Sequence, residues 1–495
     1  MKAQIKRLVR GTFIYGMGAA LQQFLGFLLL PLFTRILTPA DYGVIALIGI
    51  VTVALSGLYN LGTGNSMGLL YFREQNPVNR PSIVWTNVVL MLFSSLILVL
   101  VASAVAPQIS HLVLQTSEYA YLFRIAFVTL ALTTITGPFY AYLRMEEKAK
   151  TYVLLTVVDT IVTLLLSVYL VAILHWGVAG VYVAMLAAKA LMLLVTGIVV
   201  GRRLPFGLNL RLVKSLVRIG LPSIFGLLAF LVIDFADRQM IERLLNIESL
   251  GIYSIGYNFG MVMLLAVNAF GTAWPPFFMS FVNKRDEAQV VFGKVLKYYL
   301  LSFGALALLF FVVAKPMTVL LTAPAFHDAF TVVGLVAAAY MLKGCYLILL
   351  PGIYFAEKLY WQSAIEWVAA LMNIGLNLLL IPRIGIAGAA YATLASYLCL
   401  TVLAWIVSRR HLQVKYEWRG VSVLVVGMLS TAAVVYAVSF GLTVPYELAI
   451  SIPLLLIFLS GTFVFILNKE EKRAALEYID YIRSLFRKGG MNILS

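Results

Sequence analysis

Long apolar runs recur along almost the whole chain, and short polar segments separate them. A transmembrane helix needs about 20 mostly apolar residues, and each of these runs is at least that long. Of the 495 residues, 62% are hydrophobic and only 12% are charged, whereas an ordinary soluble chain is about 25% charged. The chain lacks the polar side chains to cover a water-facing surface of its size. This excludes a soluble enzyme, a disordered protein and a disulfide scaffold.

The runs predict an all-α integral membrane protein with about 14 transmembrane helices. The first run is too long for the core of a signal peptide, and no small-residue cleavage site follows it, so we expect an uncleaved first span. The predicted spans cover residues 11–37, 42–70, 82–106, 120–143, 151–174, 177–200, 219–245, 251–282, 295–321, 329–355, 361–381, 386–408, 420–440 and 446–467.

The positive charges agree with this count. If the spans alternate in direction, 29 of the 37 Lys and Arg residues fall on the side of the N-terminus, 4 on the opposite side and 4 inside spans. Cytoplasmic loops of membrane proteins are enriched in Lys and Arg. We therefore expect both termini in the cytoplasm, and the net charge of +16 needs no nucleic-acid partner.

The chain repeats itself at a separation of 208 residues. The segment from Arg35 to Gly43 matches the segment from Arg243 to Gly251 in its Arg, its helix-capping residue and its Gly. Two Gly-x-x-Gly pairs, at 177 and 180 and at 385 and 388, are also 208 residues apart, and two Glu-Lys pairs after spans four and ten are 210 apart. The repeat indicates two halves of six spans.

Halves with an even number of spans share one orientation in the membrane. Their pseudo-symmetry axis should follow the membrane normal, with a binding site between the halves near the midplane, as in alternating-access transporters. We expect an N-terminal lobe at 1–200, a linker at 201–218, a C-terminal lobe at 219–408, two additional helices at 409–467 and a basic amphipathic tail at 468–495. The tail is predicted to lie on the cytoplasmic membrane surface or to form a solvated helix.

The repeated residues themselves suit structural roles. Thr38 is a good helix N-cap that Asp41 can complete as a capping box, and Asn246 can cap the equivalent helix in the second half. The glycines 177, 180, 385 and 388 are expected to allow close contact between helices.

The segment from Leu30 to Gly43 resembles the first helical hairpin of the bacterial polysaccharide flippases. These are the exporters of lipid-linked oligosaccharides within the multidrug/oligosaccharidyl-lipid/polysaccharide superfamily. The Trp274-Pro275-Pro276-Phe277 break and the Glu357-Lys358 turn are also similar to that family. The resemblance implies two pseudo-symmetric six-helix lobes around a central cavity, plus two C-terminal helices.

The resemblance also implies an activity and a location. A member of this family moves an undecaprenyl-pyrophosphate-linked oligosaccharide from the cytoplasmic to the periplasmic leaflet of the bacterial inner membrane, for O-antigen, capsule or exopolysaccharide. Its expected partners are this substrate, membrane lipid, a polysaccharide polymerase and a chain-length regulator. The sequence contains no GxxxxGK[ST], HExxH or CxxC motif, so we expect no enzyme activity, no cofactor and no metal.

Ionisable residues inside spans are costly, by about 2.5–3.5 kcal/mol each on insertion scales, and mark functional sites by default. We predict that Lys189, Lys343 and Arg238 bind the substrate, and that Asp234 and Asp237 couple transport to an ion. Alternatively, the charges pair among themselves, for example Asp234 with Arg238. The full set is Arg124, Asp159, Lys189, Asp234, Asp237, Arg238, Lys343 and Glu366.

Other functions stay open at this stage. A multidrug or cation exporter of the same superfamily should have twelve spans and a more acidic cavity. A lipid II flippase is a second alternative, and the sequence does not distinguish it from a flippase for polysaccharide synthesis. A membrane-embedded glycosyltransferase or polymerase should carry long outer loops with catalytic acids, and the outer loops here are short.

Overall fold

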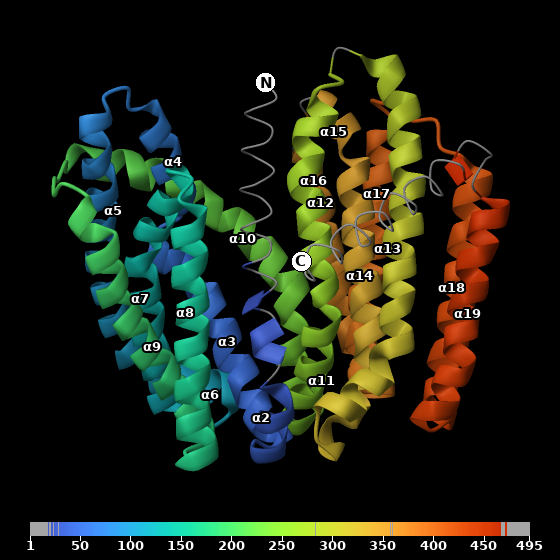
Figure 1. The fold of residues 1–495 in the computed structure, drawn as a ribbon, viewed down its shortest axis with the longest axis horizontal. Coiled ribbons are helices and arrows are strands. Elements are labelled where there is room, and N and C mark those ends of the chain that lie inside the picture. Colours follow the sequence, from blue (N-terminus) through green and yellow to red (C-terminus); the bar gives the residue numbers. More distant parts are fainter. Residues whose placement is uncertain are drawn as a thin grey trace, which may run out of the picture. The chain divides into compact units, whose positions relative to one another are not determined.

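The computed structural model describes residues 18, 21–22, 24–27, 29–282, 284–356, 358, 360–466 and 471–472, with the backbone alone at 64–65, 222–235 and 276. All regular elements in these ranges are helices (Figure 1). Packing divides the chain into two compact units. Unit 1 comprises Met1–Asn258, Thr318–Val332 and Ser363–Ser396, and unit 2 comprises Phe259–Met317, Val333–Gln362 and Tyr397–Ser495.

Unit 1 holds the helices of the first half of the chain. They are α2 (Leu30–Ile36), α3 (Pro39–Asn60), α4 (Thr63–Arg73), η1 (Pro77–Asn79), α5 (Arg80–Ala104), α6 (Ala106–Leu114), α7 (Ala120–Met145), α8 (Ala149–Ser167) with the π-helical η2 (Val168–Ile173), α9 (Gly177–Val199), η3 (Gly201–Arg203), α10 (Arg211–Leu244) and most of α11 (Ile247–Gly260). All of η4 (Pro324–Ala329) with the start of α14, most of α16 (Tyr360–Ile384) and the first part of α17 (Ile386–Ser408) also belong to it.

Unit 2 holds most of the later helices. They are α12 (Val262–Met279), most of α13 (Arg285–Leu321), most of α14 (Phe330–Leu349), α15 (Pro351–Phe355), the rest of α17, α18 (Trp418–Gly441) and α19 (Val444–Phe465). The segment Pro324–Phe355 is the most buried candidate span, whereas α18 and α19 pack on each other and expose most of their side chains.

Twelve helical segments within the described residues are long and apolar enough to cross a membrane. Each overlaps one of the fourteen predicted spans. The predicted span 219–245 falls on α10, where the side chains of 222–235 are not described, and residues 11–17 of the first span lie outside the described residues. The all-helical membrane fold is therefore confirmed, while the count of fourteen and the lobe boundaries stay predictions.

The predicted helix caps are present at both copies of the repeat. The Thr38 hydroxyl accepts a hydrogen bond from the Asp41 amide at 3.2 Å, and the Asp41 carboxylate accepts one from the Thr38 amide at 2.8 Å. In the second copy, the Asn246 side chain accepts a hydrogen bond from the Ser249 amide at 2.7 Å. Thus α3 and α11 begin with equivalent turns.

The glycines that follow these caps make a reciprocal contact. A Cβ atom added at Gly43 would overlap the Ile247 carbonyl and lie 2.6 Å from the Ile247 Cγ1 atom, and one added at Gly251 would overlap the Pro39 carbonyl and lie 2.7 Å from its carbon. Pro39 and Ile247 are themselves 208 residues apart. Each copy of the repeat therefore presents its glycine to the first helical residue of the other copy, as equivalent surfaces do about a twofold axis.

The four glycines of the Gly-x-x-Gly pairs have two different roles. Gly180 and Gly388 each lie against the backbone of the preceding helix. A Cβ added at Gly180 would be 3.2 Å from the Leu170 carbonyl, and one added at Gly388 would be 2.6 Å from the Leu380 carbonyl. Gly177 and Gly385 have no atom within 4 Å of such a Cβ, but both adopt a positive φ, of 56° and 63°. The expectation of close helix contact is wrong for these two, because the backbone there needs the left-handed conformation that glycine adopts without strain.

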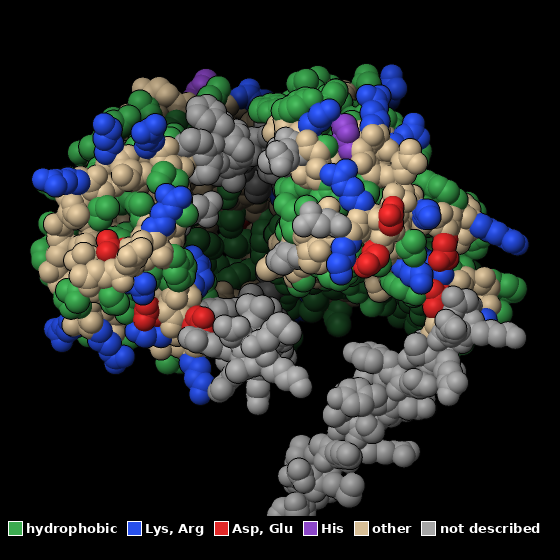
Figure 2. Space-filling model, turned by 90° about the horizontal axis from the view of Figure 1, so that it is seen from above, with side chains coloured by type: hydrophobic (Ala, Val, Ile, Leu, Met, Phe, Trp, Pro, Cys, Tyr) green, Lys and Arg blue, Asp and Glu red, His purple; other side chains and the backbone are tan. Residues whose placement is uncertain are grey.

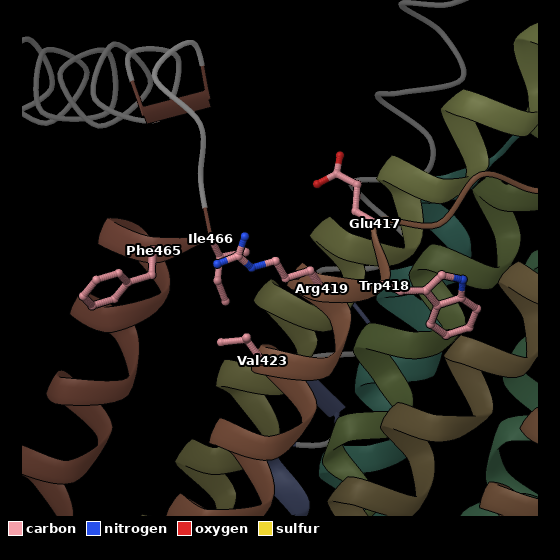
Figure 3. Close-up of a pocket in the computed structure, with 7 residues that line it drawn as sticks. Glu417, Trp418, Arg419, Val423, Phe465 and Ile466 are labelled. Carbon is pink, nitrogen blue, oxygen red and sulfur yellow. The ribbon is translucent and has the colours of Figure 1, made fainter.

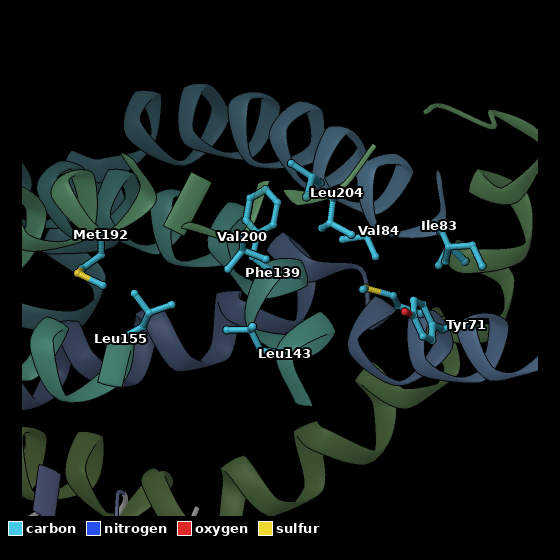
Figure 4. Close-up of a cluster of buried hydrophobic side chains, with 12 residues drawn as sticks. Tyr71, Ile83, Val84, Phe139, Leu143, Leu155, Met192, Val200 and Leu204 are labelled. Carbon is cyan, nitrogen blue, oxygen red and sulfur yellow. The ribbon is translucent and has the colours of Figure 1, made fainter. Parts of the chain in front are cut away.

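Unit 1 has an apolar core near one end of its helices (Figure 4). Side chains from α4, α5, α7, α8, α9 and α10 meet there, and the Trp85 indole donates a hydrogen bond to the Leu204 carbonyl at 3.3 Å. The fully or nearly buried members are Met67, Tyr71, Ile83, Val84, Val88, Phe139, Leu143, Leu155, Met192, Val200, Leu204 and Leu216. This core ties the segment 200–216 to the helices that carry the intramembrane charges.

Candidate functional site

Lys189 on α9 forms a salt bridge with Asp159 on α8. Both side chains are half-buried, and Asp159 Oδ1 has no hydrogen-bond partner among the described residues. The pair is neutral, which lowers the cost of both charges inside an apolar span. Because an ammonium carries three protons, Lys189 can still donate to an anionic ligand while it stays bonded to Asp159.

Asp237 and Arg238 on α10 form a buried polar cluster with α11. Arg238 Nη1 lies 3.3 Å from Asp237 Oδ1, and the Tyr253 hydroxyl donates a hydrogen bond to Asp237 Oδ2. The Arg238 guanidinium carbon lies 4.2 Å from the centroid of the Tyr257 ring, which adds a cation–π contact. Asp237 has no exposed surface in this arrangement. Arg238 therefore pairs with its neighbour Asp237, and the alternative Asp234–Arg238 pair involves a side chain outside the described ones.

One turn further along α10, Glu242 is also buried and satisfied. It accepts hydrogen bonds from the side-chain amides of Gln115 at 2.8 Å and Gln239 at 3.0 Å. Arg243 lies 3.4 Å from the same carboxylate and donates to the Leu112 carbonyl. The end of α10 is thus joined to the α6–α7 connection by side-chain hydrogen bonds.

Lys343 on α14 lies between two tyrosine rings of unit 2. Its Nζ atom is 5.7 Å from the ring centroids of both Tyr340 and Tyr397. Both tyrosines are buried, while Lys343 is half-buried. Aromatic faces stabilise a cation in a poorly solvated site. The two lysines predicted to bind substrate belong to different compact units, so a cavity shared by them stays a prediction.

Three other charges were predicted to lie inside spans. Arg124 is exposed, and its guanidinium donates to the Ser103 carbonyl at 3.2 Å, as expected for a shallow position. Glu366 is buried in α16. The side chain of Asp234 is not described, so its predicted role in ion coupling has no structural test.

Besides Glu242, two buried charges are absent from the predicted set. Lys297, which was counted among loop residues, lies inside α13 with a side chain only 2% exposed, and bonds to Glu417 at 2.8 Å and Glu471 at 3.1 Å. Glu447 at the start of α19 has no exposed surface and accepts a hydrogen bond from Ser439. Glu447 was visible in the sequence as the one acidic residue of the run 446–467.

Known proteins resemble this chain in sequence. A family model described as polysaccharide biosynthesis protein matches residues 8–282, more than half of the chain. The succinoglycan biosynthesis transport protein ExoT of Rhizobium meliloti (strain 1021) is 26% identical over 361 residues, which cover 70% of this chain and 69% of that protein.

Two solved structures illustrate the fold. The lipid II flippase MurJ in an inward closed conformation gives a TM-score of 0.70 at 13% identity, over 91% of this chain and 99% of that chain. An inward-facing multidrug resistance MATE family transporter of the MOP superfamily gives 0.67 at 13% identity, over 78% and 94%. The chain therefore has the fold of these transporters.

Proposed function

Since the chain belongs to the polysaccharide biosynthesis protein family, as its resemblance predicted, we propose that it transports an undecaprenyl-pyrophosphate-linked oligosaccharide by alternating access. The substrate moves from the cytoplasmic to the periplasmic leaflet of a bacterial inner membrane, with both termini of the protein in the cytoplasm. The translocated oligosaccharide is then used to make a surface or secreted polysaccharide. A polymerase and a chain-length regulator are the proposed partners downstream.

The observation that carries this proposal is the presence of cations at half-buried positions of candidate spans. A sugar chain with a pyrophosphate cannot enter hydrocarbon unaided, because each unpaired polar group costs several kcal/mol there. Lys189 and Lys343 are proposed to meet the pyrophosphate, one in each compact unit. The salt bridge of Lys189 to Asp159 leaves donor protons on the ammonium, which supports a binding role for this lysine. Arg238, which lies beside Asp237, is the third proposed ligand.

Asp234 and Asp237 are proposed to couple transport to an ion gradient. They lie three residues apart on α10, on one face of the helix. Asp237 is bonded to Arg238 and Tyr253, so protonation or ion binding at this carboxylate would loosen the cluster that joins α10 to α11. This link between a titratable group and a helix contact is what coupling requires.

The test is deletion of the gene in its host, followed by complementation. Loss of the polysaccharide, with lipid-linked repeat units accumulating on the inner leaflet, supports the proposal. Lys189→Ala and Lys343→Ala should each reduce export, and the double variant should abolish it, while insertion is normal. Lys214→Ala, an exposed lysine outside the charged spans, is the matched control. Full export by the double variant would eliminate the proposed binding site.

The rival functions give different results in the same experiment. A lipid II flippase would be needed for cell-wall synthesis, so its loss would stop growth and leave the polysaccharide precursor untouched. A multidrug exporter would change drug sensitivity and leave the polysaccharide intact. Loss of a glycosyltransferase would truncate the precursor itself, and loss of a polymerase would leave complete units in the periplasmic leaflet.

A further inference from the structure

A cavity of about 790 Å³ opens between the N-terminal turn of α18 and the C-terminal end of α19. These two helices pack on each other, and their paired ends lie on the side that the sequence predicts to be cytoplasmic. The cavity serves no step of the proposed transport. Its lining residues are Glu417, Trp418, Arg419, Gly420, Val423, Phe465 and Ile466.

Arg419 supplies the polar group of this cavity. Figure 3 shows its side chain reaching from α18 toward Ile466 at the end of α19. Within the described residues, the Arg419 guanidinium makes no hydrogen bond and no salt bridge, and the side chain is exposed. The other charged lining residue, Glu417, already bonds to Lys297 at 2.8 Å. Among the described residues, the cavity therefore offers a guanidinium without an ion-pair partner and a carboxylate that shares the Lys297 ammonium with Glu471.

The remaining walls are apolar and open to the surroundings. Phe465 is 84% exposed, and Val423, one turn along α18 from Arg419, is half exposed. Exposed apolar side chains continue along α18 and α19 at Val426, Leu429, Leu456 and Ile457, as expected of helices that face lipid. A ligand of this cavity therefore meets a cation at the helix ends and an apolar surface below it.

Further positive charge surrounds the opening. The Lys472 ammonium donates to the Val464 carbonyl at 2.7 Å, which brings a second cation to the end of α19. Burial, with Lys358 and Arg410 nearby, lowers the pKa of His411 in the loop before α18. Basic side chains lie over this end of unit 2 together with several acidic ones (Figure 2). At the opening itself, Arg419 and Lys472 favour an anion.

We propose that this cavity binds the phosphate of an anionic glycerophospholipid such as phosphatidylglycerol. Arg419 takes the phosphate in a bidentate contact, and one acyl chain lies on the apolar surface of α18 and α19. The lipid would hold these two peripheral helices at the inner surface of the membrane. The inference does not depend on which substrate the protein transports.

The experiment measures lipid retained by the full-length chain in detergent, by native mass spectrometry. The probes are dioleoyl phosphatidylglycerol, dioleoyl phosphatidylcholine and inorganic phosphate. We expect Arg419→Gln to lower the affinity for phosphatidylglycerol by about tenfold or more, since it removes the charge and the bidentate contact with the phosphate. Arg419→Lys should lose less, and Arg203→Gln, which removes an exposed arginine of unit 1, should change nothing.

A second variant tests the apolar wall. Phe465→Ser should weaken retention of phosphatidylglycerol, and the thermal midpoints of all variants show that each is folded. Equal retention by the native chain and Arg419→Gln would overturn the proposal, as would equal losses in Arg419→Gln and Arg203→Gln. Binding of inorganic phosphate as strong as that of the lipid would also overturn it, because the site would then be one for a free anion. Equal retention of phosphatidylcholine would contradict the preference for an anionic lipid.

Discussion

The reciprocal contact of Gly43 and Gly251 should be sensitive to a single methyl group. Carbon atoms in good contact are about 3.5–4.0 Å apart, and an added Cβ would lie 2.6 Å from Ile247 in one case and 2.7 Å from Pro39 in the other. The first turns of α3 and α11 must therefore separate by about 1 Å to admit either alanine. Overpacking of this kind costs about 1–3 kcal/mol. This cost lowers the equilibrium constant for forming the contact between α3 and α11 by roughly 5- to 150-fold.

Distances between spin labels measure this population. We place labels at Arg35 and Glu248, which are exposed near the contact, after replacing the two native cysteines, and record the distances for each variant in lipid nanodiscs. Gly43→Ala and Gly251→Ala should shift the distribution toward longer distances and reduce export. Gly49→Ala is the control, because a Cβ there meets no atom within 4 Å in the same helix α3. Distributions for Gly43→Ala and Gly49→Ala that match the native one would refute the argument.

Three further predictions concern polar groups in the spans, each read from the thermal midpoint in detergent. Lys297→Met should cost about 1–2 kcal/mol, because it leaves Glu471 without its cation while the half-exposed Glu417 is partly solvated; an unchanged midpoint would contradict this. Glu447→Ala should cost about 1–2 kcal/mol through loss of the Ser439 hydrogen bond, and Glu447→Gln, which keeps an acceptor, should cost less; equal losses would show that charge matters instead. Tyr253→Phe should cost about 1.5–3 kcal/mol, since it removes a donor from the buried Asp237, and a loss below about 0.5 kcal/mol would contradict this role of the tyrosine hydroxyl.

Much of the fold could be predicted from the sequence, because a helix that crosses a membrane must be long and apolar. The twelve candidate spans each overlap a predicted range, and the caps at Thr38 and Asn246 lie where local chemistry placed them. Hydropathy and capping act over one helix, so a single sequence reveals them. The break between α3 and α4 was missed: one span was predicted over 42–70, but Leu61 and Gly62 both take positive φ values.

The partners of the charges were harder to predict, because they depend on how helices pack. Lys189 pairs with Asp159 on another helix, 30 residues earlier, and nothing in the spacing identifies that pair. Lys297 was taken for a loop cation because it stands among charged residues, yet α13 starts twelve residues earlier and buries it. For Gly177 and Gly385, no local pattern distinguishes a need for a small side chain from a need for a left-handed backbone.

The contact between α3 and α11 is of the kind that two identical chains form with each other. A polypeptide of half this length could form the same contact with a second copy of itself. In one continuous chain, the two halves can differ in sequence. They differ at the buried polar cluster of Asp237 and Arg238. The positions 208 residues before Asp237, Arg238, Tyr253 and Tyr257 are Leu29, Leu30, Ile45 and Gly49. The first half thus has apolar residues or glycine where the second half has the polar cluster, which a symmetric dimer would have to carry twice.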